Sequence, residues 1–290
     1  MRIAKLAHAT FETPDIVRLT DYYADILGLA LIDRTADFAA FACTGDATSV
    51  ILTPGAAPRC TTLTFETATE PAVLLAELGK AGVKATQASD VESVAGQSVA
   101  FEDINGVKVR LIAPRTPHGA KAAVGIAPRK IGHVAFKVAD VQATVKFYCD
   151  VLGFRVSDWM GDFFAFLRCG PDHHTVNFLA GQPGMHHIAF EASGWDHIRS
   201  SSDDLARRGI PIIWGPGRHA IGHNIFTYHR NADSQIMELY TDLDQMSSED
   251  LGYFDPRPWH EDKPQRPKVW DPNVKSNVWG PPLPDGFRNG

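Results

Sequence analysis

The sequence has few cysteines, no excess of positive charge and no long apolar run. Four cysteines, Cys43, Cys60, Cys149 and Cys169, show no CxxC spacing, so we expect reduced thiols rather than disulfides or a zinc site. A net charge of −6 offers no basic face to a phosphate backbone, which argues against nucleic acid as a partner. No stretch approaches the roughly 18 apolar residues that cross a bilayer, so we expect no membrane partner.

The first residues lack the apolar core of a signal peptide, and we therefore expect a cytoplasmic protein. Hydrophobic residues make up 44% of the 290 residues and charged residues 21%, which is the balance of a globular protein with a real core. The chain has room for two domains of ordinary size.

The chain contains an internal duplication. Residues 6–29 (LAHATFETPDIVRLTDYYADILGL) and 131–154 (IGHVAFKVADVQATVKFYCDVLGF) share a pattern that places His8 over His133 and Gly28 over Gly153. In each copy a strand-like segment is followed by an Asp suited to cap a helix, an apolar-periodic stretch, and a Gly suited to a left-handed helix end. Each copy therefore predicts a strand followed by a helix.

Each half repeats this plan once more, with helices expected around 71–81 and 196–208 and β-rich runs such as 227–242 after them. The fold class is thus α+β, with four βαβββ modules paired into two barrel-like domains. We expect an N-terminal domain over residues 1–115 and a catalytic domain over 129–246. The Pro, Gly and Ala content of 114–128 indicates a linker between them.

Residues 247–290 form a third region, with eight prolines between positions 256 and 284 and tryptophans at 259, 270 and 279. Proline density forbids long regular elements, whereas tryptophan side chains are costly to leave in water. We expect an extended, ordered C-terminal tail that lies over the body or a neighbouring subunit. A strap is favoured over a lid, and the sequence leaves that choice open.

Three residues point to a metal. His133, His187 and Glu238 each interrupt a strand-like apolar pattern, for example Val134 and Phe136 around the first. With a period of two, the polar groups face one way and the apolar side chains the other, so something inside must neutralise them. Two histidines and one carboxylate are the ligand set of mononuclear non-haem Fe(II).

The duplication supplies an internal control. At the equivalent places the N-terminal half has His8, Thr62 and Arg110. One lost histidine and a cation in place of the carboxylate leave that half unable to hold a divalent metal. We expect one metal, in the second half.

Several short motifs in the second half carry a resemblance to a known protein family. They are GHVAF around His133, HHT at 173–175, HHIAF at 186–190, GRH ending at His219, then Tyr228 nine residues later and Glu238 ten residues after that. In this order, over about residues 1–245, the chain resembles a type I extradiol ring-cleaving dioxygenase of the vicinal oxygen chelate superfamily.

The resemblance implies Fe(II), or Mn(II) on the same ligands, held by His133, His187 and Glu238, with O2 as co-substrate. It implies opening of a catechol to a semialdehyde-type product in aromatic degradation, by a homo-oligomer. His174 would act as acid and base, and His219 and Tyr228 would bind the substrate oxygen. Ala135 and Phe166 would line the ring pocket. Ile221 departs from the polar residue that some relatives have there, which removes one substrate contact.

Two alternative functions stay open: a glyoxalase-like metal lyase or isomerase of the same superfamily, and a metal-free protein that binds a small aromatic compound. Strand alternation directs His186 away from His187 and so assigns it a structural role. Five other histidines are expected to face solvent or make local hydrogen bonds; these are His118, His197, His223, His229 and His260. The particular catechol is not predicted.

Overall fold

The structure, a computed structural model, describes residues 1–89, 97–119 and 124–289. It contains two mixed sheets, one from each half of the chain, and each sheet is built from two modules with a strand, a helix and three further strands. The predicted α+β class with four modules is confirmed. Residues 120–123 of the predicted linker lie outside the described residues.

The first sheet has eight strands in the order β2-β3-β4-β1-β5-β8-β7-β6. Its long central strands, β1 and β5, run antiparallel, and each also pairs in parallel with the last strand of its own module. The elements of this half are β1 (Ile3–Thr13), α1 (Ile16–Asp21), β2 (Ala30–Thr35), β3 (Phe38–Ala42), β4 (Val50–Pro54), β5 (Arg59–Thr67), α2 (Pro71–Lys80), β6 (Thr86–Ser89), β7 (Gln97–Glu102) and β8 (Lys108–Ile112).

The second sheet repeats this pairing in the order β14-β15-β16-β13-β9-β12-β11-β10-β17. Its central strands are β9 and β13, and the tail contributes β17 as an added edge strand beside β10. The elements are β9 (Lys130–Val138), α3 (Val141–Leu152), β10 (Arg155–Met160), β11 (Phe164–Arg168), β12 (Val176–Ala180), β13 (Gly184–Glu191), α4 (Trp195–Arg207), β14 (Trp214–Arg218), β15 (Ile225–Arg230), β16 (Ile236–Thr241) and β17 (Lys268–Trp270).

Helix α3 forms where the sequence predicts it. The Asp140 carboxylate accepts a hydrogen bond from the Ala143 amide at the first turn, and Gly153 closes the last turn with φ of +73°. Tyr148 and Leu152 bury one face of the helix against the sheet. In the first copy, α1 is followed by a π-helical turn at Tyr22–Ile26, so the two copies differ there.

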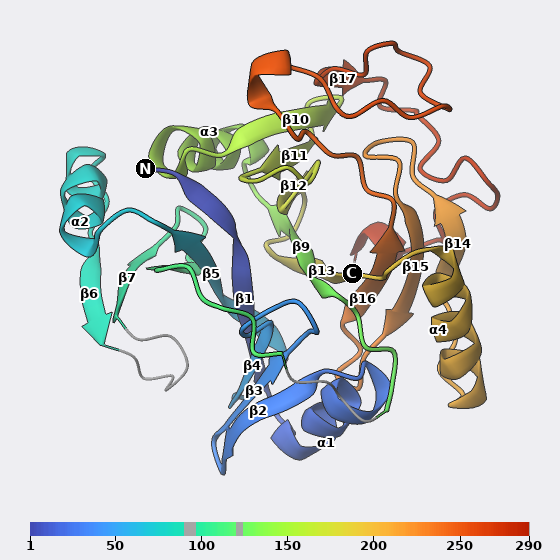
Figure 1. Cartoon of the computed structure of the whole chain (residues 1–290), viewed down its shortest axis with the longest axis horizontal. Coiled ribbons are helices and arrows are strands. Elements are labelled where there is room, and N and C mark those ends of the chain that lie inside the picture. The colour runs from blue at the N-terminus through green and yellow to red at the C-terminus, as the bar shows by residue number, and fades with distance from the viewer. Residues whose placement is uncertain (90–96, 120–123, 290) are drawn as a thin grey trace.

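The four helices lie around the outside of the molecule, while β1 and β9 run through its middle (Figure 1). No helix in the described ranges is both long enough and apolar enough to span a bilayer. All four cysteines are free, as expected.

The tail crosses the second sheet and returns to it. Trp270 packs against the buried cluster of Met160, Phe166 and Ile221, whereas Trp259 and Trp279 keep 38% and 51% of their surface exposed. Two of the three tail tryptophans therefore keep a third or more of their surface exposed. The Arg218 guanidinium lies over both exposed rings, at 4.6 and 5.0 Å from their centroids, and so covers part of their faces.

Candidate metal centre and active site

The candidate metal centre lies on three neighbouring strands of the second sheet. His133 is on β9, His187 on β13 and Glu238 on β16, and the register places Ala189 of β13 opposite both His133 and Glu238. All three side chains are buried and face the interior of the module pair. The paired modules thus bring together residues more than 100 positions apart in the chain.

The three ligand atoms form a nearly equilateral triangle. His133 Nε2 lies 3.3 Å from His187 Nε2 and 3.1 Å from Glu238 Oε2, and His187 Nε2 lies 3.2 Å from Glu238 Oε2. Ligands at about 2.1 Å from an octahedral metal are about 3.0 Å apart when adjacent and about 4.2 Å apart when opposite. All three pairs have the adjacent spacing, so the donor set fits one face of an octahedral metal ion.

The protonation states suit metal binding. Burial lowers the pKa of His133, which leaves its imidazole neutral near pH 7. Burial alone would raise the pKa of Glu238, but the contacts of its carboxylate with the His133 and His187 rings hold it well below its ordinary value. The site therefore offers one carboxylate, and a bound metal ion would take the Nε2 atoms of the two imidazoles in place of these contacts. The other Glu238 oxygen, Oε1, accepts a hydrogen bond of 2.9 Å from Asn224 Nδ2, which orients the carboxylate.

His186 was assigned to the opposite face, and this prediction is wrong. A register irregularity in β13 between Met185 and His187 breaks the strand alternation, so both histidines line the same cavity. Burial lowers the pKa of His186 to about 3. Its Nε2 donates to the Phe287 carbonyl oxygen at 2.9 Å, so its Nδ1 is free to accept from His187 Nδ1, 2.7 Å away. These two hydrogen bonds leave the lone pair of His187 on Nε2, which faces the metal centre.

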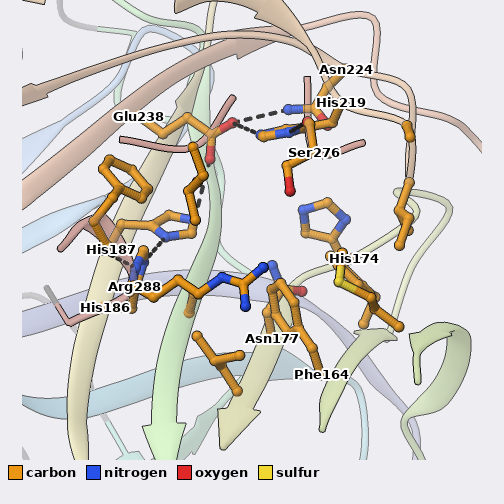
Figure 2. A pocket seen from close by; sticks show the side chains of 18 of the residues that line it. Phe164, His174, Asn177, His186, His187, His219, Asn224, Glu238, Ser276 and Arg288 are labelled. Carbon is orange, nitrogen blue, oxygen red and sulfur yellow. Dashed lines mark hydrogen bonds and ion pairs between the residues drawn. The ribbon is translucent and has the colours of Figure 1, made fainter. Parts of the chain in front are cut away.

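The cavity beside the triangle contains every other predicted site residue. It is lined by His174, His219, Tyr228, Ala135 and Phe166, as well as by the three candidate ligands. His173 lies outside it, which agrees with the choice of His174 over its neighbour. Figure 2 shows His174, His219 and Glu238 around one open space.

His174 is connected to a buried proton relay. Its Nδ1 lies 2.9 Å from His173 Nδ1, and His173 Nε2 lies 3.0 Å from Asp158 Oδ2. Burial, followed by the charges of neighbouring histidines, lowers the pKa of His174 well below its ordinary value. When His173 Nε2 donates to Asp158, His173 Nδ1 accepts from His174 Nδ1, which leaves His174 Nε2 as a base. A proton gained at Nε2 can therefore be stabilised through His173 by the Asp158 carboxylate.

His219 and Tyr228 form a bonded pair on the other side of the cavity. His219 Nδ1 donates to the Ser276 carbonyl oxygen at 2.8 Å, and burial lowers the pKa of His219 to about 4. The imidazole is therefore neutral with its lone pair on Nε2, and it accepts from the Tyr228 hydroxyl at 3.0 Å. Burial raises the pKa of Tyr228 well above 10, so the phenol stays protonated and can reorient toward a substrate oxygen.

The tail supplies part of the cavity wall, which the sequence did not predict. Six of its residues line the cavity: Val274, Lys275, Ser276, Leu283, Phe287 and Arg288. Through the carbonyl groups of Ser276 and Phe287, the tail also sets the tautomers of His219 and His186. It is therefore more than a strap over the outside of the domain.

Four of the five histidines expected to be peripheral have defined partners, and His197 Nε2 bonds the Ile126 carbonyl oxygen at 2.6 Å. His229 is buried and bonds the Tyr22 hydroxyl of the other half at 2.6 Å. His223 and His260 both contact Asp244, with Nδ1···Oδ2 of 2.7 Å and Nε2···Oδ1 of 3.2 Å. The contact of His260 with Asp244 joins the tail to the segment just after β16. Neither His229 nor His260 faces solvent.

The duplicated positions in the first half are buried as well. The register of the first sheet places Thr64 opposite both His8 and Arg110, as Ala189 lies opposite both His133 and Glu238. Arg110 thus occupies the equivalent of the Glu238 position. A guanidinium at that place excludes a second copy of the metal centre.

Comparisons with known proteins agree with this geometry. A family model described as Glyoxalase/Bleomycin resistance protein/Dioxygenase superfamily matches residues 130–244. The second half of the chain is therefore similar to members of this superfamily. The matched segment begins with β9 and ends just beyond β16, so it includes all three candidate metal ligands.

Curated relatives include extradiol enzymes, so the resemblance drawn from the motifs is confirmed. Metapyrocatechase 2 of Cupriavidus necator is 32% identical over 122 residues, which cover 41% of this chain and only 38% of that protein. A manganese-dependent 2,3-dihydroxybiphenyl 1,2-dioxygenase of Geobacillus genomosp. 3 is 27% identical over 98% of both chains. An iron-dependent extradiol dioxygenase of Rhodococcus jostii is 26% identical over 76% of this chain and 82% of that protein.

Among solved structures, the Mn(II)-bound glyoxalase from Novosphingobium aromaticivorans is 26% identical, with a TM-score of 0.84 over 99% of this chain and 94% of that one. The duplicated fold and the tail are therefore present together in a known structure.

Proposed function

We propose that this chain opens the ring of a catechol next to its two hydroxyl groups, with O2, at a mononuclear metal centre held by His133, His187 and Glu238. The observation that supports this most is the triangle of ligand atoms with adjacent octahedral spacings, which faces a cavity containing His174, His219 and Tyr228. Residues 129–246 would be catalytic, residues 1–115 would support them, and residues 247–290 would complete the wall. Assembly into a homo-oligomer remains a prediction.

The metal would be Fe(II), and Mn(II) suits the same ligands. Bound in this site, the ion would lower the pKa of a catechol hydroxyl and bring the ring and O2 together. An iron-dependent and a manganese-dependent relative both resemble the chain, so the choice of ion rests on metal analysis of the protein.

The surrounding residues would position the substrate and transfer its protons. His174, with a free Nε2, would take a proton from the substrate and return it at a later stage, with His173 and Asp158 stabilising the charge. Tyr228 would donate to a substrate oxygen on the other side, with His219 as its partner. Apolar side chains such as Phe166 and Ile221 would exclude water from the ring.

The test is anaerobic loading of the protein with Fe(II) and a catechol, followed by admission of O2. We expect one O2 consumed per catechol, a yellow ring-opened product, and both atoms of ¹⁸O2 in that product. Loaded protein that binds the catechol but consumes no O2 with either Fe(II) or Mn(II) would contradict the proposal.

A glyoxalase-like lyase or isomerase is the second candidate, because the solved structure described above carries that name. All three candidate ligands here come from one half of the chain, and the relay of His174, His173 and Asp158 suits proton delivery to a ring-bound intermediate. The same incubation separates the two, since a lyase or isomerase would consume no O2.

A further inference from the structure

We propose that Asn177 binds a neutral hydroxyl group on a substituent of the catechol ring, and so makes the cavity selective for hydroxyl-bearing catechols. This inference rests on the proposed ring cleavage and narrows its substrate class. The sequence motifs did not single out Asn177, which comes from β12 and lines the cavity that contains the metal centre. In Figure 2 it lies on the side of the cavity away from Glu238.

The register places Asn177 one step outward from the metal centre. Asn177 pairs with Ala135 of β9 and with Phe166 of β11, so the three side chains form a row on the face of the sheet that lines the cavity. Along β9 this row lies two residues from His133, which is about 6.7 Å. A catechol bound at the metal and extending over the row would place a ring substituent beside Asn177, because the side chain of Ala135 is small.

The side-chain oxygen of Asn177 is a buried acceptor without a partner. The residue is 2% exposed, and among the described residues no group donates a hydrogen bond to its Oδ1. Such an atom is costly to bury, and most buried polar atoms of folded proteins have a partner. An unpaired acceptor in the wall of a cavity therefore points to a ligand that donates a hydrogen bond.

The equivalent position in the first sheet shows that the fold does not require this amide. Ile51 pairs with Thr10 there, as Asn177 pairs with Ala135 in the second sheet. Ile51 is fully buried, so an apolar side chain packs at this place in the repeated fold. The amide belongs to the half that holds the candidate metal centre, and packing alone does not explain it.

The charges around the cavity restrict the donor to a neutral group. An ammonium group could also donate to Oδ1, but Lys275 and Arg288 line the cavity and would repel a further positive charge. Glu238, the candidate metal ligand, is the one carboxylate among the described lining residues. A carboxylate substituent has no hydrogen to donate, and its oxygens would be repelled by Oδ1. A hydroxyl group donates one hydrogen bond and carries no charge.

An alkyl group of the same size is the informative competitor. It would fill the space beside Asn177 and exclude water, and it would leave Oδ1 without a partner in the complex. A site built to pair with a hydroxyl group discriminates against such an analogue because the buried polar group stays unpaired. The preference should therefore appear in the binding of the catechol as well as in kcat/KM.

The test uses two matched pairs of catechols, in which 3- and 4-(hydroxymethyl)catechol are compared with 3- and 4-ethylcatechol. The anaerobic dissociation constant and kcat/KM in air are measured for each compound with the metal-loaded protein. We expect the wild type to favour the hydroxymethyl compound in at least one pair. Asn177→Leu replaces the amide by an apolar group of similar size, and it should lower that preference by about tenfold or more.

Phe166→Leu is the matched control, because Phe166 lies in the same row and carries no polar side-chain atom. It should change the affinities of both members of a pair alike and leave their ratio as in the wild type. A wild type that favours the ethyl compound in both pairs, or an unchanged ratio in Asn177→Leu, would overturn this inference and leave ring cleavage standing. Consumption of no O2 with any of the four catechols would instead count against the proposed function, and the inference would fall with it.

Discussion

The two halves of the chain share one fold and differ in what they hold inside it. In the second half His133, His187 and Glu238 converge within 3.3 Å of one another, whereas the first half has His8, Thr62 and Arg110 at the matching positions. Both sets are buried. The comparison separates residues that the fold requires from residues that chemistry requires, because only the former need to be alike in both halves.

The largest expected effect is loss of the metal. Glu238→Gln removes the only negative charge of the ligand triangle, so we expect no bound metal and no turnover. Metal content measured by elemental analysis after desalting checks this.

Arg110→Gln is the matched control in the first half, together with Thr62→Ala. Both should retain one metal per chain and full activity. A loss of metal in either control, with the fold intact by circular dichroism, would mean that the first half contributes to binding.

A smaller effect should follow removal of the proton relay. His174→Phe keeps an aromatic ring in the cavity and leaves the ligand triangle untouched, so we expect normal metal content and slower turnover. The decrease in kcat should be about 10²-fold or more, the usual scale for a general acid or base. Metal analysis beside steady-state kinetics distinguishes this from misassignment, since a protein without metal would show that His174 is a ligand.

The next smaller effect concerns the hydrogen bond between His186 and His187. His186→Ala removes the group that fixes the tautomer of His187, so metal affinity should fall by about 10- to 100-fold. A competition titration with a chelator measures this. Unchanged affinity would show that the bond between the two imidazoles does not tune the centre. The first half has Thr61 and Thr62 at the equivalent places, so this support also belongs to one half.

The smallest effect concerns how the halves are joined. Tyr22→Phe removes the hydroxyl that bonds the buried His229, and should lower the free energy of unfolding by about 1–2 kcal/mol. Urea denaturation followed by fluorescence checks this. The metal content should not change, because neither residue lies in the cavity lining. A fall in metal content would instead show that the first half helps to position the centre.

The parts that the sequence predicted share a physical basis. The candidate ligands could be singled out because each interrupts an apolar strand pattern, and because the duplicated half has other residues at the two equivalent positions Thr62 and Arg110. His186 was misplaced because a register irregularity in β13 ends the alternation on which the prediction depended. Asn177, which lines the cavity and stands between Val176 and Phe178, also interrupts an apolar strand, and that signal could have identified it.

The contribution of the tail could not be predicted in the same way. A proline-rich segment has no periodicity that relates one residue to the next, so nothing in its sequence indicates which carbonyl or side chain meets the cavity. Ser276 and Phe287 act through backbone carbonyl groups, which every residue carries. Only the folded structure shows which of them reach His219 and His186.

The position of the metal is tested most directly by anomalous diffraction from crystals of the Fe(II)- or Mn(II)-loaded protein. We expect one strong peak per chain, bounded by His133 Nε2, His187 Nε2 and Glu238 Oε2. A principal peak beside His8 and Arg110, or at the other His and Asp group formed by His223, Asp244 and His260, would contradict it.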